Sequence, residues 1–126
     1  MEYSIEKKSA SSGSLLKFEG ALTIYVITDL KSELLKELNS AEGSLTIDFA
    51  GLEEIDTAGI QLLILLKEQA RQIGVELVYS SHSPALLRVM DLYGLVGYFA
   101  DFIRLNKKER AGYRFKYGVK KITNPA

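Results

Sequence analysis

The chain has 126 residues, of which 47% are apolar and 25% are charged, with 16 basic and 16 acidic side chains. This length suits one globular domain, and this composition excludes disordered and fibrous proteins. Because there is no cysteine, disulfides, thiolate metal sites and cysteine nucleophiles are excluded as well.

The sequence predicts a cytoplasmic protein that does not insert into membranes. Its N-terminus has no apolar signal core, and its longest apolar run, Leu62–Leu66, is too short to span a bilayer. The lack of cysteine fits a reducing compartment. Seven basic side chains but only one acidic side chain follow residue 105, which leaves the first 105 residues with a net charge of −6. This polarity suits charge-steered association with partners.

Alternation of apolar and polar residues predicts strands, and apolar residues at helical spacing predict helices. In chain order we expect a strand before residue 9, a strand at Leu15–Leu22, a helix from about Tyr25 to Asn39, a strand at Ser44–Phe49, a loop at Gly51–Asp56, a helix from about Thr57 to Ile73, a strand at Val75–Tyr79, a helix at Ala85–Leu92 and a last core strand near Phe102–Leu105. The order β-β-α-β-α-β-α-β predicts an α/β fold, with a mixed β-sheet covered by helices. Right-handed crossovers would make the third and fourth strands neighbours.

Residues 106–126 form a basic tail beyond the expected domain of residues 1–105. Within the tail, the stretch Tyr113–Val119 alternates aromatic or apolar residues with basic or small residues, which is typical of an amphipathic strand. We expect an edge strand with its lysines in water. Binding to an acidic membrane, a nucleic acid or a partner protein is the alternative.

The second helix is apolar nearly all round in its first half. Leu62, Leu63 and Leu66 share one face, whereas Ile64 and Leu65 fall on or beside the polar side. Such a helix must be covered either by neighbouring helices of its own chain or by another protein.

Few residues in the sequence favour catalysis, and we expect no enzyme activity, cofactor or metal. His82 is the only histidine, and the glycines form neither phosphate-binding motif. A Ser–His–Asp arrangement or a small hydrolase site would have to come from a short set of polar residues, for which no nucleophile-elbow sequence exists. These residues are Ser80, Ser81, His82, Ser83 and Asp91, or the acidic cluster of Glu53, Glu54 and Asp56 with Thr57.

The most informative stretch is Ile55-Asp56-Thr57-Ala58-Gly59-Ile60, at the start of the second helix. Either Asp56 or Thr57 can cap this helix by accepting backbone N–H groups. A hydroxyl here can also accept a phosphate, because free N–H groups and the helix dipole would stabilise the added charge. The residues leave both roles open. The small side chains of Ala58 and Gly59 allow close approach to the backbone.

This pattern resembles the STAS family, the fold of bacterial anti-sigma-factor antagonists, over roughly residues 3–105. The resemblance is carried by four stretches of the sequence, of which the D-[ST]-x-G-x-x-x-L element is the most specific. They are Gly20-Ala-Leu-Thr-Ile-Tyr25, Leu45-Thr-Ile-Asp-Phe49, Ile55-Asp-Thr-Ala-Gly-Ile-Gln-Leu-Leu63, and His82-Ser-Pro-Ala-Leu-Leu87 with Leu92-Tyr-Gly-Leu95.

The resemblance implies a regulatory protein-binding module that is switched by phosphorylation of Thr57. The expected partner is an anti-sigma factor with serine/threonine kinase activity, or a related signalling ATPase. Nucleic acid is not expected to bind directly, and a homodimer is possible. The expected partner-binding residues are Thr23, Asp56, Ala58, Gly59, Gln61, Ile64 and Leu65.

One departure from the antagonist pattern leaves the pathway open. Many antagonists carry an acidic residue where this chain has Thr23. The Leu-Thr-Ile-Tyr and Asp-Thr-Ala-Gly-Ile-Gln stretches resemble STAS proteins of chemotaxis-type signalling. The Asp-Thr-Ala-Gly element also resembles the STAS subunit that supports the ATPase of a lipid-transport ABC complex.

Overall fold

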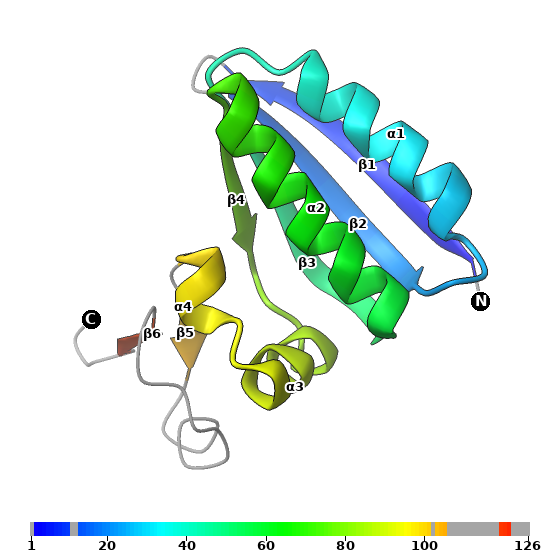
Figure 1. Ribbon diagram of the computed structural model, residues 1–126, viewed down its shortest axis with the longest axis vertical. Coiled ribbons are helices and arrows are strands. Elements are labelled where there is room, and N and C mark those ends of the chain that lie inside the picture. The colour runs from blue at the N-terminus through cyan, green and yellow to red at the C-terminus, as the bar shows by residue number, and fades with distance from the viewer. Residues whose placement is uncertain (1, 11–12, 102, 106–118, 122–126) are drawn as a thin grey trace.

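The computed structural model describes residues 2–10, 13–101, 103–105 and 119–121 (Figure 1). A four-stranded mixed sheet has the order β1-β2-β3-β4, in which β1 is antiparallel to β2 and the other pairs are parallel. Its strands are β1 (Tyr3–Ala10), β2 (Gly13–Leu22), β3 (Ser44–Ile55) and β4 (Glu76–Ser80). The expected mixed α/β sheet and the neighbouring third and fourth strands are therefore confirmed.

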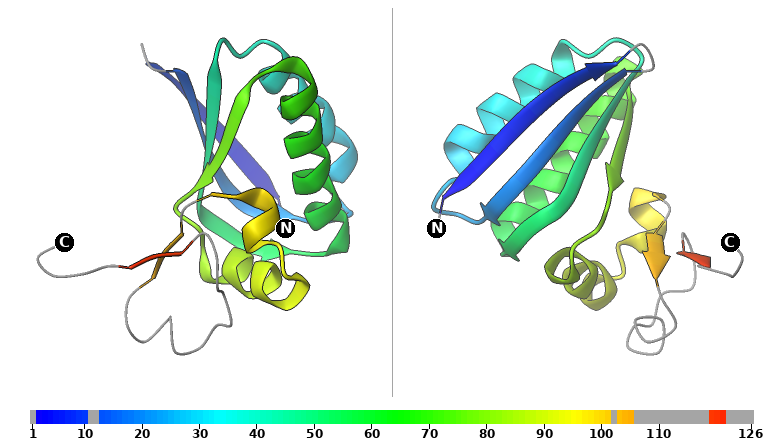
Figure 2. Two further views of the ribbon diagram at one scale, coloured as in Figure 1. Left: turned by 60° about the vertical axis from the view of Figure 1, so that its left-hand side comes forward. Right: turned by 180° about the vertical axis from the view of Figure 1, so that it is seen from behind.

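The helices α1 (Ile27–Asn39) and α2 (Thr57–Ile73) lie side by side across one face of this sheet (Figure 1). The helices α3 (Pro84–Tyr93) and α4 (Val96–Phe99) follow β4. Seen from behind, the opposite face of the sheet carries none of the described helices (Figure 2). None of the helices in the described part of the chain combines the length and the apolar character needed to cross a membrane.

The core fills the space between the sheet and the two long helices. Four aromatic rings form a continuous row through it: Phe18, Phe49, Tyr79 and Phe99 pack edge to face, with centroids 5.4–5.8 Å apart. Such contacts stabilise by about 0.5–1.5 kcal/mol each beyond the area that they bury. The row links β2 to the residues of α4, so it fixes the short helix against the sheet.

Two expectations about the strands need correction. The expected loop at Gly51–Asp56 is instead the second half of β3, which runs to Ile55. Two register shifts in β2 allow this, because they keep the twisted strands paired until Leu22 meets Ile55. The strand expected near Phe102–Leu105 exists as β5 (Ile103–Leu105), but it pairs with β6 (Val119–Lys121) and not with the core sheet.

The tail was expected to carry an edge strand at Tyr113–Val119. Residues 113–118 lie outside the described residues, and the observed strand β6 begins at Val119. Its partner β5 runs parallel to it.

Candidate functional site

The first turn of α2 is capped by Asp56, which settles the choice between Asp56 and Thr57. The Asp56 Oδ1 atom accepts the N–H of Gly59 at 3.1 Å, and Oδ2 accepts the N–H of Ile24 at 2.9 Å. One carboxylate therefore ties the helix to the loop between β2 and α1. Because Asp56 is the cap, the hydroxyl of Thr57 is not needed for that role, and Thr57 is exposed at the first helical position.

Two of the expected partner-binding residues lie beneath this surface. Gly59 is buried, and a Cβ atom there would lie 2.2 Å from the carbonyl oxygen of Leu22, so only glycine lets α2 approach the end of β2 this closely. Thr23 is only 5% exposed. Both residues therefore support the site from below, and neither offers a side chain to a partner. The expected close approach at Ala58–Gly59 is found at Gly59.

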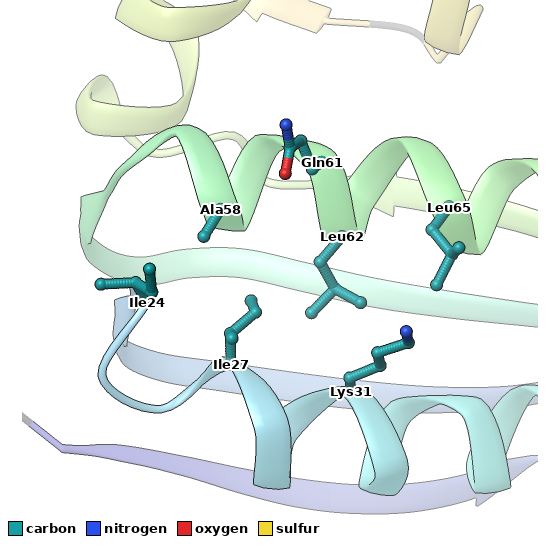
Figure 3. A pocket seen from close by; sticks show the side chains of 7 residues that line it. All are labelled: Ile24, Ile27, Lys31, Ala58, Gln61, Leu62 and Leu65. Carbon is teal, nitrogen blue, oxygen red and sulfur yellow. The ribbon is translucent and has the colours of Figure 1, made fainter.

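An apolar groove runs between α1 and α2 beside Thr57 (Figure 3). Its volume is about 410 Å³, and it is open to solvent on one side. Figure 3 shows Ile27 and Lys31 of α1 and Leu62 and Leu65 of α2 pointing into the space between the two helices, whereas Gln61 points away from it. The lining residues are Ile24, Ile27, Lys31, Ala58, Gln61, Leu62 and Leu65. Of the loop residues only Thr23 was part of the expected site, whereas Ile24 and the α1 residues Ile27 and Lys31 were not. Ile24 does belong to the Gly20–Tyr25 stretch that carries the family resemblance.

Several apolar side chains at or next to the groove are exposed to solvent. Ile24 is 63% exposed, Tyr25 is 91% exposed and Leu65 is 38% exposed. Ile24 and Leu65 line the groove and Tyr25 follows Ile24 in the chain, so the groove is a candidate interaction surface. The two apolar residues on the polar side of α2 therefore differ: Leu65 is exposed, whereas Ile64 is half-buried and packs against the protein's own core.

The charges around Thr57 are mainly negative. Glu53 and Glu54 are exposed at the end of β3, four and three residues before Thr57. Asp56 adds a third carboxylate, while Lys31 supplies a positive charge to the groove. A phosphate on Thr57 would therefore add charge to a surface that is already acidic.

Two residues of the alternative hydrolase site, His82 and Ser83, are described in detail by the structure. Ser83 is buried and caps α3, because its Oγ accepts the N–H of Leu86 at 3.2 Å, and Pro84 occupies the first helical position. The Nε2 atom of His82 is buried without a hydrogen-bond partner among the described residues. Burial, aided by the nearby charge of Lys67, lowers the pKa of His82 to about 4. Within the part of the chain that the structure describes, no group of His, Asp and Glu side chains could hold a metal ion.

A buried ion pair joins the middle of α2 to the second residue after α4, and the sequence did not lead us to expect it. Lys67 Nζ lies 2.9 Å from Asp101, and both side chains are less than one-tenth exposed. Burial lowers the pKa of Lys67 and raises the pKa of Asp101, while the contact between the two groups opposes both shifts. Lys67 Nζ also lies 4.7 Å from the centre of the Tyr79 ring.

Comparison with known proteins identifies the class. The family described as "Mlab, STAS domain" matches residues 5–104, so the chain belongs to the STAS domain family. The resemblance seen in the sequence is thereby confirmed.

Individual relatives and solved structures that resemble this chain include proteins described as anti-sigma factor antagonists. BtrV of Bordetella bronchiseptica, described as an anti-sigma factor antagonist, is 29% identical over 87 residues, which cover 69% of this chain and 72% of BtrV. The crystal structure of an anti-sigma factor antagonist from Mycobacterium paratuberculosis matches with a TM-score of 0.66 and 19% identity, over 78% of this chain and 83% of that one. The unphosphorylated form of the antagonist SpoIIAA matches with a TM-score of 0.54 and 12% identity, over 68% and 80%. These two structures show the shared fold.

Proposed function

We propose that this chain is a regulatory protein-binding module whose partner affinity is controlled by phosphorylation of Thr57. The observation that carries the proposal is the geometry of the first turn of α2. Asp56 caps the helix, Thr57 stands exposed beside it, and an apolar groove opens next to both. The similarity to BtrV supports an anti-sigma factor as the partner, and the family resemblance of the sequence implies that this partner has kinase activity.

The groove between α1 and α2 is the proposed contact surface. Ile24, Tyr25 and Leu65 supply exposed apolar area, and Gln61 supplies a polar group at the edge. An apolar centre with a polar rim is the usual anatomy of a protein interface. Asp56 and Ala58 shape this surface, while the buried Thr23 and Gly59 hold its backbone in place.

Phosphorylation acts on this surface mainly through charge. The first turn of a helix has N–H groups without partners inside the helix, and these can bind a phosphate, so the modified protein stays folded. The phosphate adds about −1.5 to −2 charge at pH 7 beside Asp56, Glu53 and Glu54. The phosphate changes the electrostatic potential and the shape of the contact surface. A partner whose surface complements the unmodified protein therefore dissociates.

A second candidate is a STAS subunit that supports the ATPase of a lipid-transport ABC complex. The family match under the name Mlab favours it, as does the Asp-Thr-Ala-Gly element. In that role the same groove would bind an ATPase, and Thr57 would be a contact and not a switch. A STAS component of a chemotaxis or two-component pathway would use the same surface with a different kinase. None of these roles assigns a catalytic step to the chain.

The test uses the anti-sigma kinases and signalling ATPases of the source organism, purified singly. Each is incubated with the full chain and ATP, and the modified residue is mapped by mass spectrometry. We expect one phosphate on Thr57 with one of these kinases, no modification of Thr57→Ala, and normal modification of Thr28→Ala, which removes another exposed threonine nearby.

Two results separate the candidates. Phosphate at another hydroxyl, in Thr57→Ala as well as in the unmodified sequence, contradicts the switch. Binding to an ABC-type ATPase without any phosphorylation selects the transporter subunit. Gel filtration of each mixture measures that binding directly.

A further inference from the structure

The strand β4 lies at the edge of the core sheet, so half of its backbone groups point away from the sheet. The N–H of Glu76 donates to the carbonyl of Gly43 at 2.9 Å, which directs Glu76 towards β3. Successive residues of a strand direct their N–H and C=O groups to opposite edges. Leu77 and Tyr79 therefore direct theirs outward, where a fifth strand would pair.

The ion pair Lys67–Asp101 occupies this place. Lys67 Nζ donates to the outward carbonyl of Leu77 at 2.6 Å, and the outward N–H of Tyr79 donates to the carboxylate of Asp101. The two side chains also bind each other at 2.9 Å. One cation and one anion thus take the acceptor and the donor that an added strand would use. Inward-pointing charges at a sheet edge are a known means of preventing strand pairing.

The backbone after α4 is shaped to bring Asp101 to this edge. Ala100 adopts a left-handed conformation with φ of 60°, which is costly for a residue with a Cβ atom. Ala100 and Asp101 line an open hollow of about 350 Å³ together with Glu76, Leu77 and Val78 of β4. The edge is therefore reached by solvent beside the ion pair, and within the described residues the ion pair, this turn and the Phe99 ring lie against it.

The edge is complementary to itself. In an antiparallel pair of two β4 strands centred on Val78, Leu77 of one copy faces Tyr79 of the other, and these are the two outward residues. Glu76 then faces Ser80, so no like charges oppose each other. Val78 faces its own copy on the open side of the sheet, where it is half-buried in the single chain. A two-fold pair in this register joins two sheets into one.

We propose that the Lys67–Asp101 pair is a latch that keeps the β4 edge closed, and that opening it allows a second copy of this chain to pair along β4. The latch is distinct from the groove beside Thr57, because its residues line a separate hollow on the other side of α2.

The experiment replaces both charges in the full chain with apolar residues of similar size, Lys67→Met together with Asp101→Leu. Circular dichroism checks the fold, and sedimentation equilibrium measures the mass. We expect the double variant to form dimers of twice the 14.0 kDa chain mass. Its dimer dissociation constant should be at least tenfold lower than that of the unmodified protein. Hydrogen exchange of the Leu77 and Tyr79 amides should slow as the dimer forms.

The matched control adds Val78→Lys to the double variant. It places like charges opposite each other at the centre of the pair but leaves the inward hydrogen bonds of β4 to β3 unchanged, so we expect the monomer to return. If the double variant does not fold, Asp101→Asn, which keeps the shape and removes the charge, undergoes the same measurements. A folded variant that stays monomeric overturns the latch, and a dimer that Val78→Lys leaves intact overturns the pairing along β4.

Discussion

The first turn and the middle of α2 differ in the environment that they give to charged groups. At the first turn of α2, Thr57 is exposed and the acidic groups around it are in contact with water. About ten residues further on, Lys67 is buried and is neutralised by Asp101 and the carbonyl of Leu77. A charge added at the first place is hydrated and changes what the surface binds, whereas a charge left alone at the second place destabilises the fold.

In the proposed switch, this difference would separate regulation from stability along α2. The helix remains fixed to the sheet by its buried face and by the ion pair, so its first turn can gain or lose a phosphate without refolding. The tie between Asp56 and the N–H of Ile24 keeps the exposed loop in register with the helix start. Substitutions at the two places should therefore affect different measurements, and the following experiments test whether they do.

The largest effect is expected when one partner of the buried pair is removed. Lys67→Met leaves the carboxylate of Asp101 buried without its cation, which should lower the free energy of unfolding by roughly 3–5 kcal/mol. Urea denaturation measures this loss. Adding Asp101→Leu should restore most of it, because replacing both members of a buried pair is often neutral. A loss below 1 kcal/mol in the single variant would mean that the two places differ less than the structure indicates.

The next effect comes from His82, which lies near Lys67. Its pKa is about 4 in the folded protein and 6.5 without the fold, so the unfolded chain binds a proton more readily between these pH values. Stability is therefore fully present above pH 6.5 and falls as the pH drops towards 4, by roughly 3 kcal/mol in total. Urea titrations at several pH values should show a smaller fall for His82→Gln. Equal slopes for both proteins would contradict the buried state of the imidazole.

Removing residues 106–126 tests how far the domain extends. The chain ending at Leu105 loses the β5–β6 pair but keeps every strand of the core sheet and the residue Asp101. We expect a loss of roughly 0–2 kcal/mol, within the range of ordinary surface changes. Circular dichroism and thermal unfolding measure it. An unfolded product would show that the tail belongs to the core.

A smaller change in stability is expected at the rim of the groove. Leu65→Asp should alter the free energy of unfolding by less than about 1 kcal/mol, because the side chain is already partly hydrated. Binding to the partner should weaken at least tenfold, as expected for an apolar interface residue. The neighbouring Leu66→Asp is the control, because Leu66 is 1% exposed and its replacement should unfold the domain. Unfolding by Leu65→Asp would place this rim in the core.

Local patterns in the sequence predicted most of the elements. The apolar spacing located α1, α2 and α3, and the structure places local helix-end residues at two of their ends: Gly74 follows α2 and Ser83 precedes α3. The course of β3 through residues 51–55 was missed, because the acidic residues there look like a loop. Only its pairing with the bulged end of β2 makes the stretch a strand.

The sequence predicted the site residues that belong to one continuous segment, but not those that the fold brings in from elsewhere in the chain. Asp56 and Thr57 were found because capping is a local property, whereas Ile24 and Ile27 reach the groove only through the packing of α1 on α2. One local pattern could have indicated that Lys67 is buried: it lies four residues after Leu63 and three before Ala70, on the buried face of α2. Its partner Asp101 is 34 residues away, and only the fold brings the two together.

The most direct test of the account measures Thr57 phosphorylation by binding and unfolding on the same samples. Phosphorylated protein, unmodified protein, Thr57→Ala and Thr57→Glu are compared by calorimetric titration with the partner kinase and by urea denaturation. We expect all four to unfold within about 1 kcal/mol of one another, because the first turn of α2 can accommodate the charge. Thr57→Ala should bind like the unmodified protein, Thr57→Glu more weakly, and the phosphorylated form at least tenfold more weakly. Equal binding by the phosphorylated and unmodified forms would contradict the role of Thr57 as a switch.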